Sequence, residues 1–148
     1  MNASELFVRC LENEGVEVVF GLPGEEMLDL LDALRRSKIR FLPTRHEQAA
    51  AFMADIYGRL TGRAGVCLST LGPGAMNLAT GIADANLDHA PMVAITGQIG
   101  LEDTHKESHQ HIDTAEMYRA ITKWSTKLDT PHITPEVVRK AFRMAEAE

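Results

Sequence analysis

Residues 65–96, GVCLSTLGPGAMNLATGIADANLDHAPMVAIT, contain the pattern that decides the fold. The apolar run at 65–70 predicts a strand, a Gly-Pro-Gly turn follows it, and the small and apolar residues at 75–87 predict a helix. A second apolar run at 92–96 predicts another strand, and its nearly continuous apolarity is typical of a strand covered on both faces. A strand followed by a helix and another strand indicates a parallel βαβ unit.

The same alternation continues along the rest of the chain. Further strands are predicted at 16–20, 39–44 and 123–128, and further helices before Gly15, at 27–34, 46–60 and 113–118, and from Thr134 onward. This order indicates an α/β protein with a doubly wound, mostly parallel sheet of roughly four to six strands. Residues 1–148 form one domain, and because the final helical pattern has no cap, we expect a fragment of a larger multi-domain enzyme.

The charge and composition exclude several classes of protein. Of 148 residues, 15 are Lys or Arg and 21 are Asp or Glu, so the net charge is −6 and no general basic field is available for nucleic acid. The apolar runs are far shorter than the roughly 20 residues of a membrane-spanning helix, and the first residues lack a secretory signal. Cys10 and Cys67 are expected in the core rather than in a disulfide. We therefore expect a cytoplasmic protein without a nucleic-acid or membrane partner.

Four loops follow the four best-defined strands, and in an open parallel sheet such loops carry the ligand. The loops begin at Gly21, Arg45, Leu71 and Gly97. Glycine, which is frequent in three of them, serves either a tight turn or the close approach of a ligand to the backbone, and the pattern leaves both open. The topology places along one edge of the sheet Pro23, Glu47, Gly74 and Gln98.

Glu47 is the sharpest candidate for chemistry. It opens a predicted helix whose next turn, residues 49–53, is small and apolar, so its carboxyl lies at the rim of a buried surface. A glutamate in a first turn also stabilises the helix dipole without any chemistry. The spacing Gly72-x-Gly74-x-x-Asn77 matches a dinucleotide fingerprint only in part, because Asn77 replaces the third glycine.

Three histidines lie within the seven residues 105–111, HKESHQH. His105 and His109 have the spacing of one helical turn, but the segment supplies neither a cysteine nor a regular third ligand. We therefore predict no metal site in this chain.

Taken together, the motifs resemble those of the N-terminal, pyrimidine-binding domain of thiamine-diphosphate-dependent enzymes of the acetolactate synthase and pyruvate oxidase group. The segments that carry the resemblance are VVFGLPG (18–24), RHEQAAAFMA (45–54), GRLTG (58–62), GPGAMN (72–77), GIADA (81–85) and ITGQ (95–98). The resemblance covers essentially the whole chain. It implies a flavodoxin-like fold that binds thiamine diphosphate.

The resemblance also implies roles for individual residues. Glu47 falls on the family glutamate that hydrogen-bonds N1′ of the aminopyrimidine and favours the imino tautomer, whose exocyclic nitrogen then takes the proton of thiazolium C2. Gln110 falls on an active-site glutamine that donates to substrate. The pyrimidine pocket is expected to be lined by Pro23, Gly24, Thr70, Gly74 and Asn77. Glu25 and Glu26 depart from the small pair often found there and are expected to favour the first turn of the next helix.

One half of the family's site has no counterpart in this sequence. The Gly-Asp-Gly segment that, with a later Asn, holds Mg²⁺ and the diphosphate is absent here and lies on a separate domain in the family. Since the family's site forms between two subunits, the resemblance implies a homo-oligomer, at least a dimer. It also implies that the isolated domain is inactive, and it leaves room for FAD in the full enzyme.

We therefore interpret the chain as the pyrimidine-binding half of an acetolactate synthase-like transferase. Such an enzyme decarboxylates pyruvate or another 2-oxoacid and joins the product to a second one, as in branched-chain amino acid biosynthesis. The alternatives within the family are a 2-oxoacid decarboxylase, a pyruvate oxidase-like or glyoxylate carboligase-like enzyme, or a subunit of a split decarboxylase. Outside the family, the alternative is a flavodoxin-like, non-catalytic nucleotide-binding module.

Overall fold

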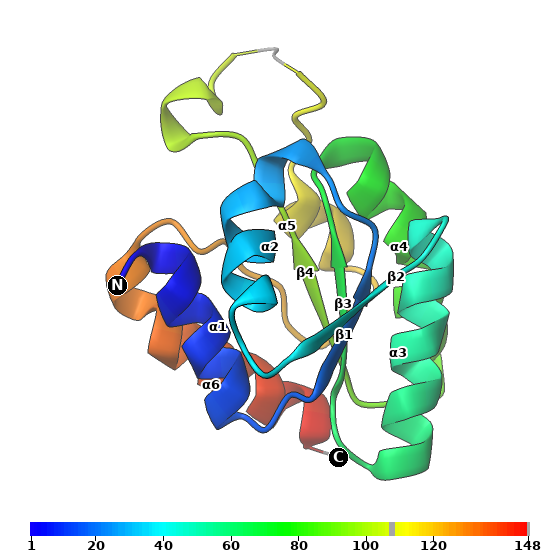
Figure 1. Ribbon diagram of the computed structural model, residues 1–148. Coiled ribbons are helices and arrows are strands. Elements are labelled where there is room, and N and C mark those ends of the chain that lie inside the picture. The colour runs from blue at the N-terminus through cyan, green and yellow to red at the C-terminus, as the bar shows by residue number, and fades with distance from the viewer. Residues whose placement is uncertain (107–108, 148) are drawn as a thin grey trace.

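A four-stranded parallel sheet forms the centre of the computed structural model, which describes residues 1–106 and 109–147. The strands are β1 (Val18–Gly21), β2 (Arg40–Pro43), β3 (Gly65–Ser69) and β4 (Met92–Thr96), in the order β2-β1-β3-β4 (Figure 1). All three pairings are parallel, which confirms the α/β prediction. The order agrees with that of flavodoxin-like sheets, in which ligands bind where the order reverses, between β1 and β3.

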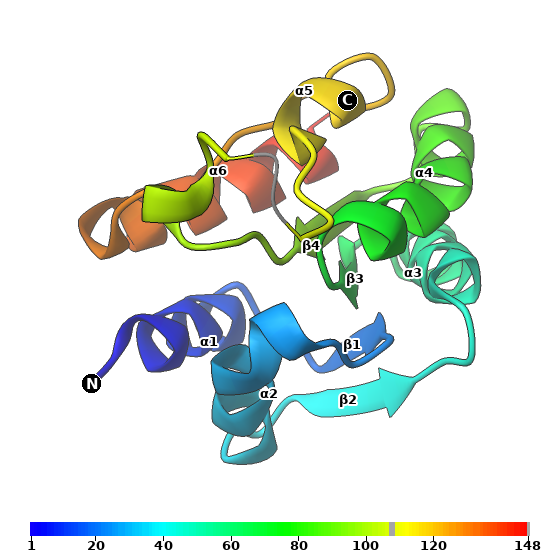
Figure 2. The same ribbon diagram turned by 90° about the horizontal axis from the view of Figure 1, so that it is seen from above.

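Helices cover both faces of the sheet. The helices are α1 (Ala3–Asn13), α2 (Leu28–Arg35), α3 (Glu47–Thr61), α4 (Gly72–Leu87), α5 (Thr114–Tyr118) and α6 (Thr134–Glu146). Short 3₁₀ turns are found at Glu25–Met27, Leu101–Asp103 and Pro131–Ile133. Viewed from above, α1, α2 and α6 lie on one side of the sheet, and α3 and α4 lie on the other (Figure 2).

Neighbouring strand residues supply two separate cores. Val19 and Val66 pack with α1, α2 and α6, whereas Phe20 and Cys67 pack with α3, α4 and α5. This alternation follows from the two-residue period of a strand. Burial raises the pKa of the Cys67 thiol to about 12, and both Cys10 and Cys67 are free and buried, as predicted.

Small residues let α3 approach α4 closely. A Cβ atom at Gly81 would lie 2.6 Å from Cβ of Ala51. At the far end of α3, Arg59 binds the buried Asp55 through two hydrogen bonds of 2.8 Å, and it also contacts Asp84 on α4 at 3.0 Å. Close packing at one place and an ion-pair network at another therefore fix the position of α3 on α4.

The structure refines one prediction at β4 and corrects another beside it. Val93 and Ile95 pack against one core and Met92 and Ala94 against the other, yet every residue of β4 is only half-buried because the strand lies at the edge of the sheet. Residues 123–128 are not a strand, because they lie apart from β4 across a cavity instead of pairing with it. A strand-like pattern forms a strand only where a neighbour pairs with its backbone. Within the described residues, no helix is both long and apolar enough to cross a membrane.

We predict that Gly81→Ala lowers the free energy of unfolding by about 1–3 kcal/mol, because the added methyl group pushes α3 away from α4. Alanine has the higher helix propensity, so a loss must come from packing. Thr80→Ala, at the exposed neighbouring position, is the control and should change stability by less than about 0.5 kcal/mol. Urea unfolding measures both variants, and an unchanged Gly81→Ala variant would contradict the close packing.

Candidate functional site

The carboxyl ends of the four strands bring the predicted loops to one edge of the sheet. Hydrogen bonds join these loops across the edge, from Thr44 N to Gly21 O at 2.8 Å and from Gly97 N to Ser69 O at 2.9 Å. Pro23, Glu47 and Gly74 follow β1, β2 and β3, and Gln98 follows β4 in the same way. The parallel topology therefore places all four at this edge, as expected.

Glu47 lies at the centre of this edge with its carboxyl buried. It is the first residue of α3 and only 6% exposed. Asn77 of α4 donates a hydrogen bond from Nδ2 to Glu47 Oε2 at 2.9 Å. Among the described residues, no group forms a hydrogen bond with Oε1. The carboxyl therefore has one oxygen bound by the protein and one available to a ligand.

Glycines leave little room around this carboxyl. A Cβ atom at Gly74 would lie 3.1 Å from Glu47 Oε1 and 2.9 Å from Cγ2 of Thr70. A Cβ atom at Gly24 would lie 2.4 Å from Cβ of Thr70. These contacts cross the ends of β1, β3 and β2 in sequence, from Gly24 to Thr70 and Gly74 and then to Glu47. The absence of two side chains leaves backbone surface to which a flat group can lie close.

The first turns of the helices hold the site in place. His46 caps α3, because its Nδ1 accepts a hydrogen bond from Gln48 N at 3.2 Å. The buried Tyr118 hydroxyl donates to Ala75 O in the first turn of α4, and burial raises the pKa of this phenol. Both contacts fix the backbone on which Glu47 and Asn77 stand.

Gln110 lies beside Gly72, the first residue of α4. It is exposed and has a left-handed backbone, with φ of 56°. Its carbonyl oxygen would lie 2.2 Å from a Cβ atom at Gly72, which itself has φ of 46°. Gln110 and Gly72 line a cavity of about 560 Å³ together with Pro73, Met76, Thr104, His105, Lys106, His111 and Ile112.

Several other candidates are on the surface. Pro23, Glu25 and Glu26 are exposed on the turn after β1, which fits the expectation that the two acids serve the helix start. Residues 105–111 include two positions outside the described part of the chain. Within the described part, no three histidine, cysteine or acidic side chains come together as metal ligands.

Sequence reasoning missed two contacts. Asn77 was predicted to line the pocket, but its contact with Glu47 depends on how closely α3 packs on α4, which no local pattern reveals. Gln98 donates from Nε2 to Ile112 O at 2.9 Å and so anchors the segment that carries Gln110. The only available signal was the position of Gln98 directly after a strand.

Comparisons with known proteins match the chain to a family and to individual relatives. The family model described as "Thiamine pyrophosphate enzyme, N-terminal TPP binding domain" matches residues 1–117. The chain is 46% identical over 144 residues to "Acetolactate synthase" of Bacillus subtilis, and 45% identical over 145 residues to "Probable acetolactate synthase large subunit" of Methanocaldococcus jannaschii. These matches cover 97% and 98% of this chain. The chain spans about a quarter of the length of these relatives, 25% and 24% respectively.

We predict that Asn77→Asp destabilises the fold in a pH-dependent way. At pH 8 the free energy of unfolding should fall by about 1–3 kcal/mol. The substitution removes the hydrogen bond to Glu47 and places a second carboxylate beside its buried carboxyl group. At pH 5 the loss should be smaller, because the folded pair can hold a proton between the carboxylates, and stability therefore falls as pH rises.

Gln48→Glu is the matched control for Asn77→Asp. It adds the same charge beside Glu47, but neighbouring helical side chains point in different directions. Its stability should show no comparable pH dependence in urea unfolding between pH 5 and 8. Equal pH dependence in the two variants would mean that Asn77 does not face the carboxyl of Glu47.

Proposed function

Since the chain belongs to the thiamine pyrophosphate enzyme family, through the N-terminal TPP-binding domain that it matches over residues 1–117, we propose that it supplies the pyrimidine-binding half of an acetolactate synthase-like active site. The substrate is pyruvate or another 2-oxoacid, and the reaction is a decarboxylation followed by carbon–carbon bond formation. The names of the relatives support this choice of reaction. Thiamine pyrophosphate and thiamine diphosphate are the same cofactor.

The buried carboxyl of Glu47 is the observation that carries this proposal. Its free oxygen, Oε1, faces the space that Gly74 leaves open, and its other oxygen is held by Asn77. A flat ring with a basic nitrogen at its edge fits this environment, because the ring can lie against backbone and the nitrogen can meet Oε1. The residues present therefore fit the aminopyrimidine of thiamine diphosphate.

Each residue of the site then has a defined task. When bound, thiamine diphosphate supplies an electron sink for the carbanion that decarboxylation produces. Glu47 holds a proton at Oε1 and shares it with the ring nitrogen N1′. Asn77 keeps Oε2 occupied, so that the proton stays on the side of the ligand. Gly24, Thr70 and Gly74 provide the surface against which the ring lies.

The remaining site residues act at the margin of this surface. Pro23 borders the ring, and Gln110 donates a hydrogen bond to the oxoacid, held in place by the contact with Gly72. Mg²⁺ and the diphosphate are bound by a different domain, and the proposal leaves room for FAD in the full enzyme. The two free, buried cysteines are compatible with a reducing compartment such as the cytoplasm.

A second copy of the chain is the proposed partner. Met53, Ile56 and Leu60 recur at helical spacing on α3 and are 40%, 50% and 81% exposed. Leu87 of the adjacent α4 is 76% exposed. These apolar side chains lie on the two helices that form one side of the molecule (Figure 1). Apolar groups clustered at the surface mark an interface.

We predict that Glu47→Gln, introduced into a full-length enzyme that contains this domain, lowers turnover about 10²- to 10⁴-fold. Glutamine keeps the shape and one hydrogen bond but removes the carboxyl group that shares a proton with N1′. The rate of hydrogen–deuterium exchange at C2 of the bound cofactor should fall in parallel, whereas cofactor affinity should change less. Unchanged exchange together with unchanged turnover would reduce Glu47 to a residue that stabilises the helix dipole.

We also predict that the 148-residue chain dimerises but does not consume pyruvate. Light scattering should give a dimer at high concentration, and Ile56→Lys together with Leu60→Lys should give a monomer, because both charges enter the apolar surface. Asn13→Lys, which adds a charge at an exposed position on α1, is the control and should leave the dimer intact. A wild-type monomer argues against the partner, and pyruvate consumption by the chain alone argues against a half-site.

A further inference from the structure

Gln98 uses both polar ends of its side chain, each on a different stretch of backbone. Its Nε2 donates a hydrogen bond to Ile112 O at 2.9 Å, and its Oε1 accepts one from Ile99 N at 3.0 Å. The side chain is half-buried, so both hydrogen bonds are partly shielded from water. Gln98 therefore ties the loop after β4 to the segment that carries Gln110.

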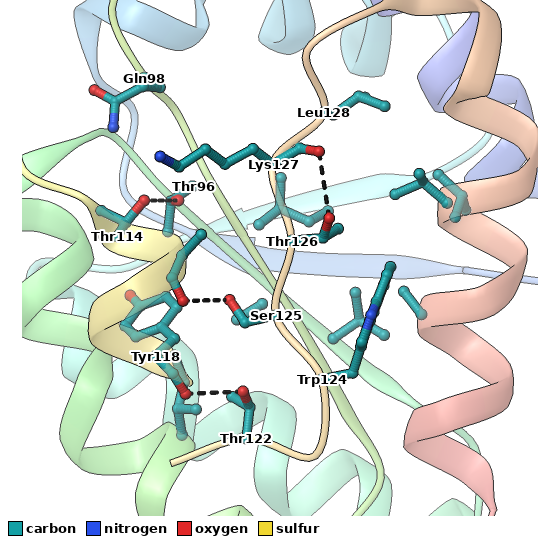
Figure 3. A pocket seen from close by; sticks show the side chains of 18 of the residues that line it. Thr96, Gln98, Thr114, Tyr118, Thr122, Trp124, Ser125, Thr126, Lys127 and Leu128 are labelled. Carbon is teal, nitrogen blue, oxygen red and sulfur yellow. Dashed lines mark hydrogen bonds between the residues drawn. The ribbon is translucent and has the colours of Figure 1, made fainter. Parts of the chain in front are cut away.

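The sheet gives Gln98 a fixed position. Thr96, the last residue of β4, pairs with Ser69 of β3, and Gly97 N donates to Ser69 O at 2.9 Å. Figure 3 shows Gln98 just beyond Thr96, whose hydroxyl group lies 3.5 Å from that of Thr114 at the start of α5. A side chain that stands on a regular strand can position a less regular segment opposite it.

Gly72 contacts the same segment from the neighbouring strand. It follows β3, and a Cβ atom there would lie 2.2 Å from Gln110 O, so the two backbones touch. Gln98 follows β4, which pairs with β3, and it binds the chain two residues further on, at Ile112. Residues 110–112 are therefore held at two points by the ends of two paired strands.

The backbone of Gln110 makes its side chain sensitive to this clamp. Its φ of 56° lies in the left-handed region, which is uncommon for a residue other than glycine. Residues held in this region depend on the structure around them to stay there. A shift of φ to the extended region would point the side chain of Gln110 in another direction.

From these contacts we infer that Gln98 is a positioning residue of the reaction, whose hydrogen bond to Ile112 O sets where the side chain of Gln110 meets the oxoacid. The inference rests on the proposed function, in which Gln110 donates to the substrate, and it names what holds that donor in place. Gln98 thus acts on oxoacid binding and not on activation of the cofactor. Among the described residues, no hydrogen bond joins Gln98 to Glu47 or to Asn77.

Gln98→Glu, introduced into a full-length enzyme that contains this domain, tests the clamp. Glutamate keeps the oxygen that accepts from Ile99 N, but its ionised carboxylate cannot donate to Ile112 O. At pH 8 we expect KM for pyruvate to rise about 5- to 10-fold, the effect of losing one hydrogen bond. We expect kcat to change by less than about twofold. Hydrogen–deuterium exchange at C2 of the bound cofactor should keep its wild-type rate.

The pH dependence of KM gives a readout that a purely structural role would not move. Once protonated, the introduced carboxyl group can donate to Ile112 O, so the KM of Gln98→Glu should return toward the wild-type value as pH falls from 8 to 5.5. The carbonyl oxygen opposite the carboxylate favours this protonation, because it raises the pKa of the group.

Gln98→Met is the uncharged companion of this variant. It loses both hydrogen bonds, so its KM should be raised at every pH. Because methionine adds no charge, a raised KM in this variant also excludes simple repulsion between an added carboxylate and the anionic substrate.

A double variant separates positioning from direct contact with the substrate. If Gln98 acts through Gln110, then Gln98→Met combined with Gln110→Ala should match Gln110→Ala alone in kcat/KM within about twofold, since no side chain is left to position. Ser125→Ala is the matched control, because it removes a hydrogen bond of the same kind, from Ser125 Oγ to Ala115 O at 2.8 Å, outside residues 110–112. Its KM should equal that of the wild type.

Amide hydrogen exchange in the 148-residue chain checks the geometry without substrate or cofactor. The amide of Ile99 is held by the side chain of Gln98, so it should exchange at least about 10-fold faster in Gln98→Met than in the wild type. In Gln98→Glu it should remain protected, because the accepting oxygen is still present.

Three results would overturn the inference. The first is a wild-type KM in Gln98→Met while Gln110→Ala raises KM, which would leave the proposed task of Gln110 intact. The second is an equal effect of Gln98→Met with and without Gln110, which would make Gln98 a direct contact of the substrate. The third is a wild-type KM in Gln110→Ala, which would remove the proposed task of Gln110 together with this inference. The task of Glu47 is judged separately by exchange at C2.

Discussion

The close approach of α3 to α4 is the constraint on which the site depends. Gly81 lies against Ala51, and Gly65 lies so near α3 that a Cβ atom there would be 2.0 Å from Ala54 O. Larger side chains at these positions would separate the helices from each other or from the sheet. Only at this spacing can Asn77 on α4 reach Glu47 on α3. The small residues in the middle of α3 and α4 therefore determine that Asn77 binds Oε2 of Glu47 and leaves Oε1 free.

Much of the fold could be predicted because its signals are local. Apolar runs, caps and turn glycines locate every strand of the sheet and most helices to within a few residues, and parallel topology then brings the loops together. Residues 123–128 show the limit of such reasoning. Their pattern is that of a strand, yet pairing requires a neighbouring backbone at about 4.8 Å, and no local pattern reports whether one is present. The half-burial of β4 has the same cause.

The candidate site, like the fold, could be predicted from the sequence only in part. The place of Glu47 at the start of a helix could be predicted from the residues around it, and its role was inferred from the family resemblance. Its pairing with Asn77 could not be predicted, because the contact joins two helices whose rotation about their axes is set by packing. The contact between Gly72 and Gln110 could not be predicted from the sequence either. Both residues have positive φ, which is uncommon for a residue other than glycine and is not signalled by the glutamine side chain.

The position of Cys67 makes it a natural reporter on the integrity of the sheet. Its sulfur lies in the middle of β3, 4.0 Å from the sulfur of Met92 on β4, with no exposed surface. Burial raises the pKa of this thiol so far that it stays protonated at pH 7, and the thiolate is the form that reacts. Alkylating reagents can therefore modify Cys67 only when the helices that cover this face of the sheet move away from it. The rate of covalent labelling at this single atom measures how often the centre of the molecule opens.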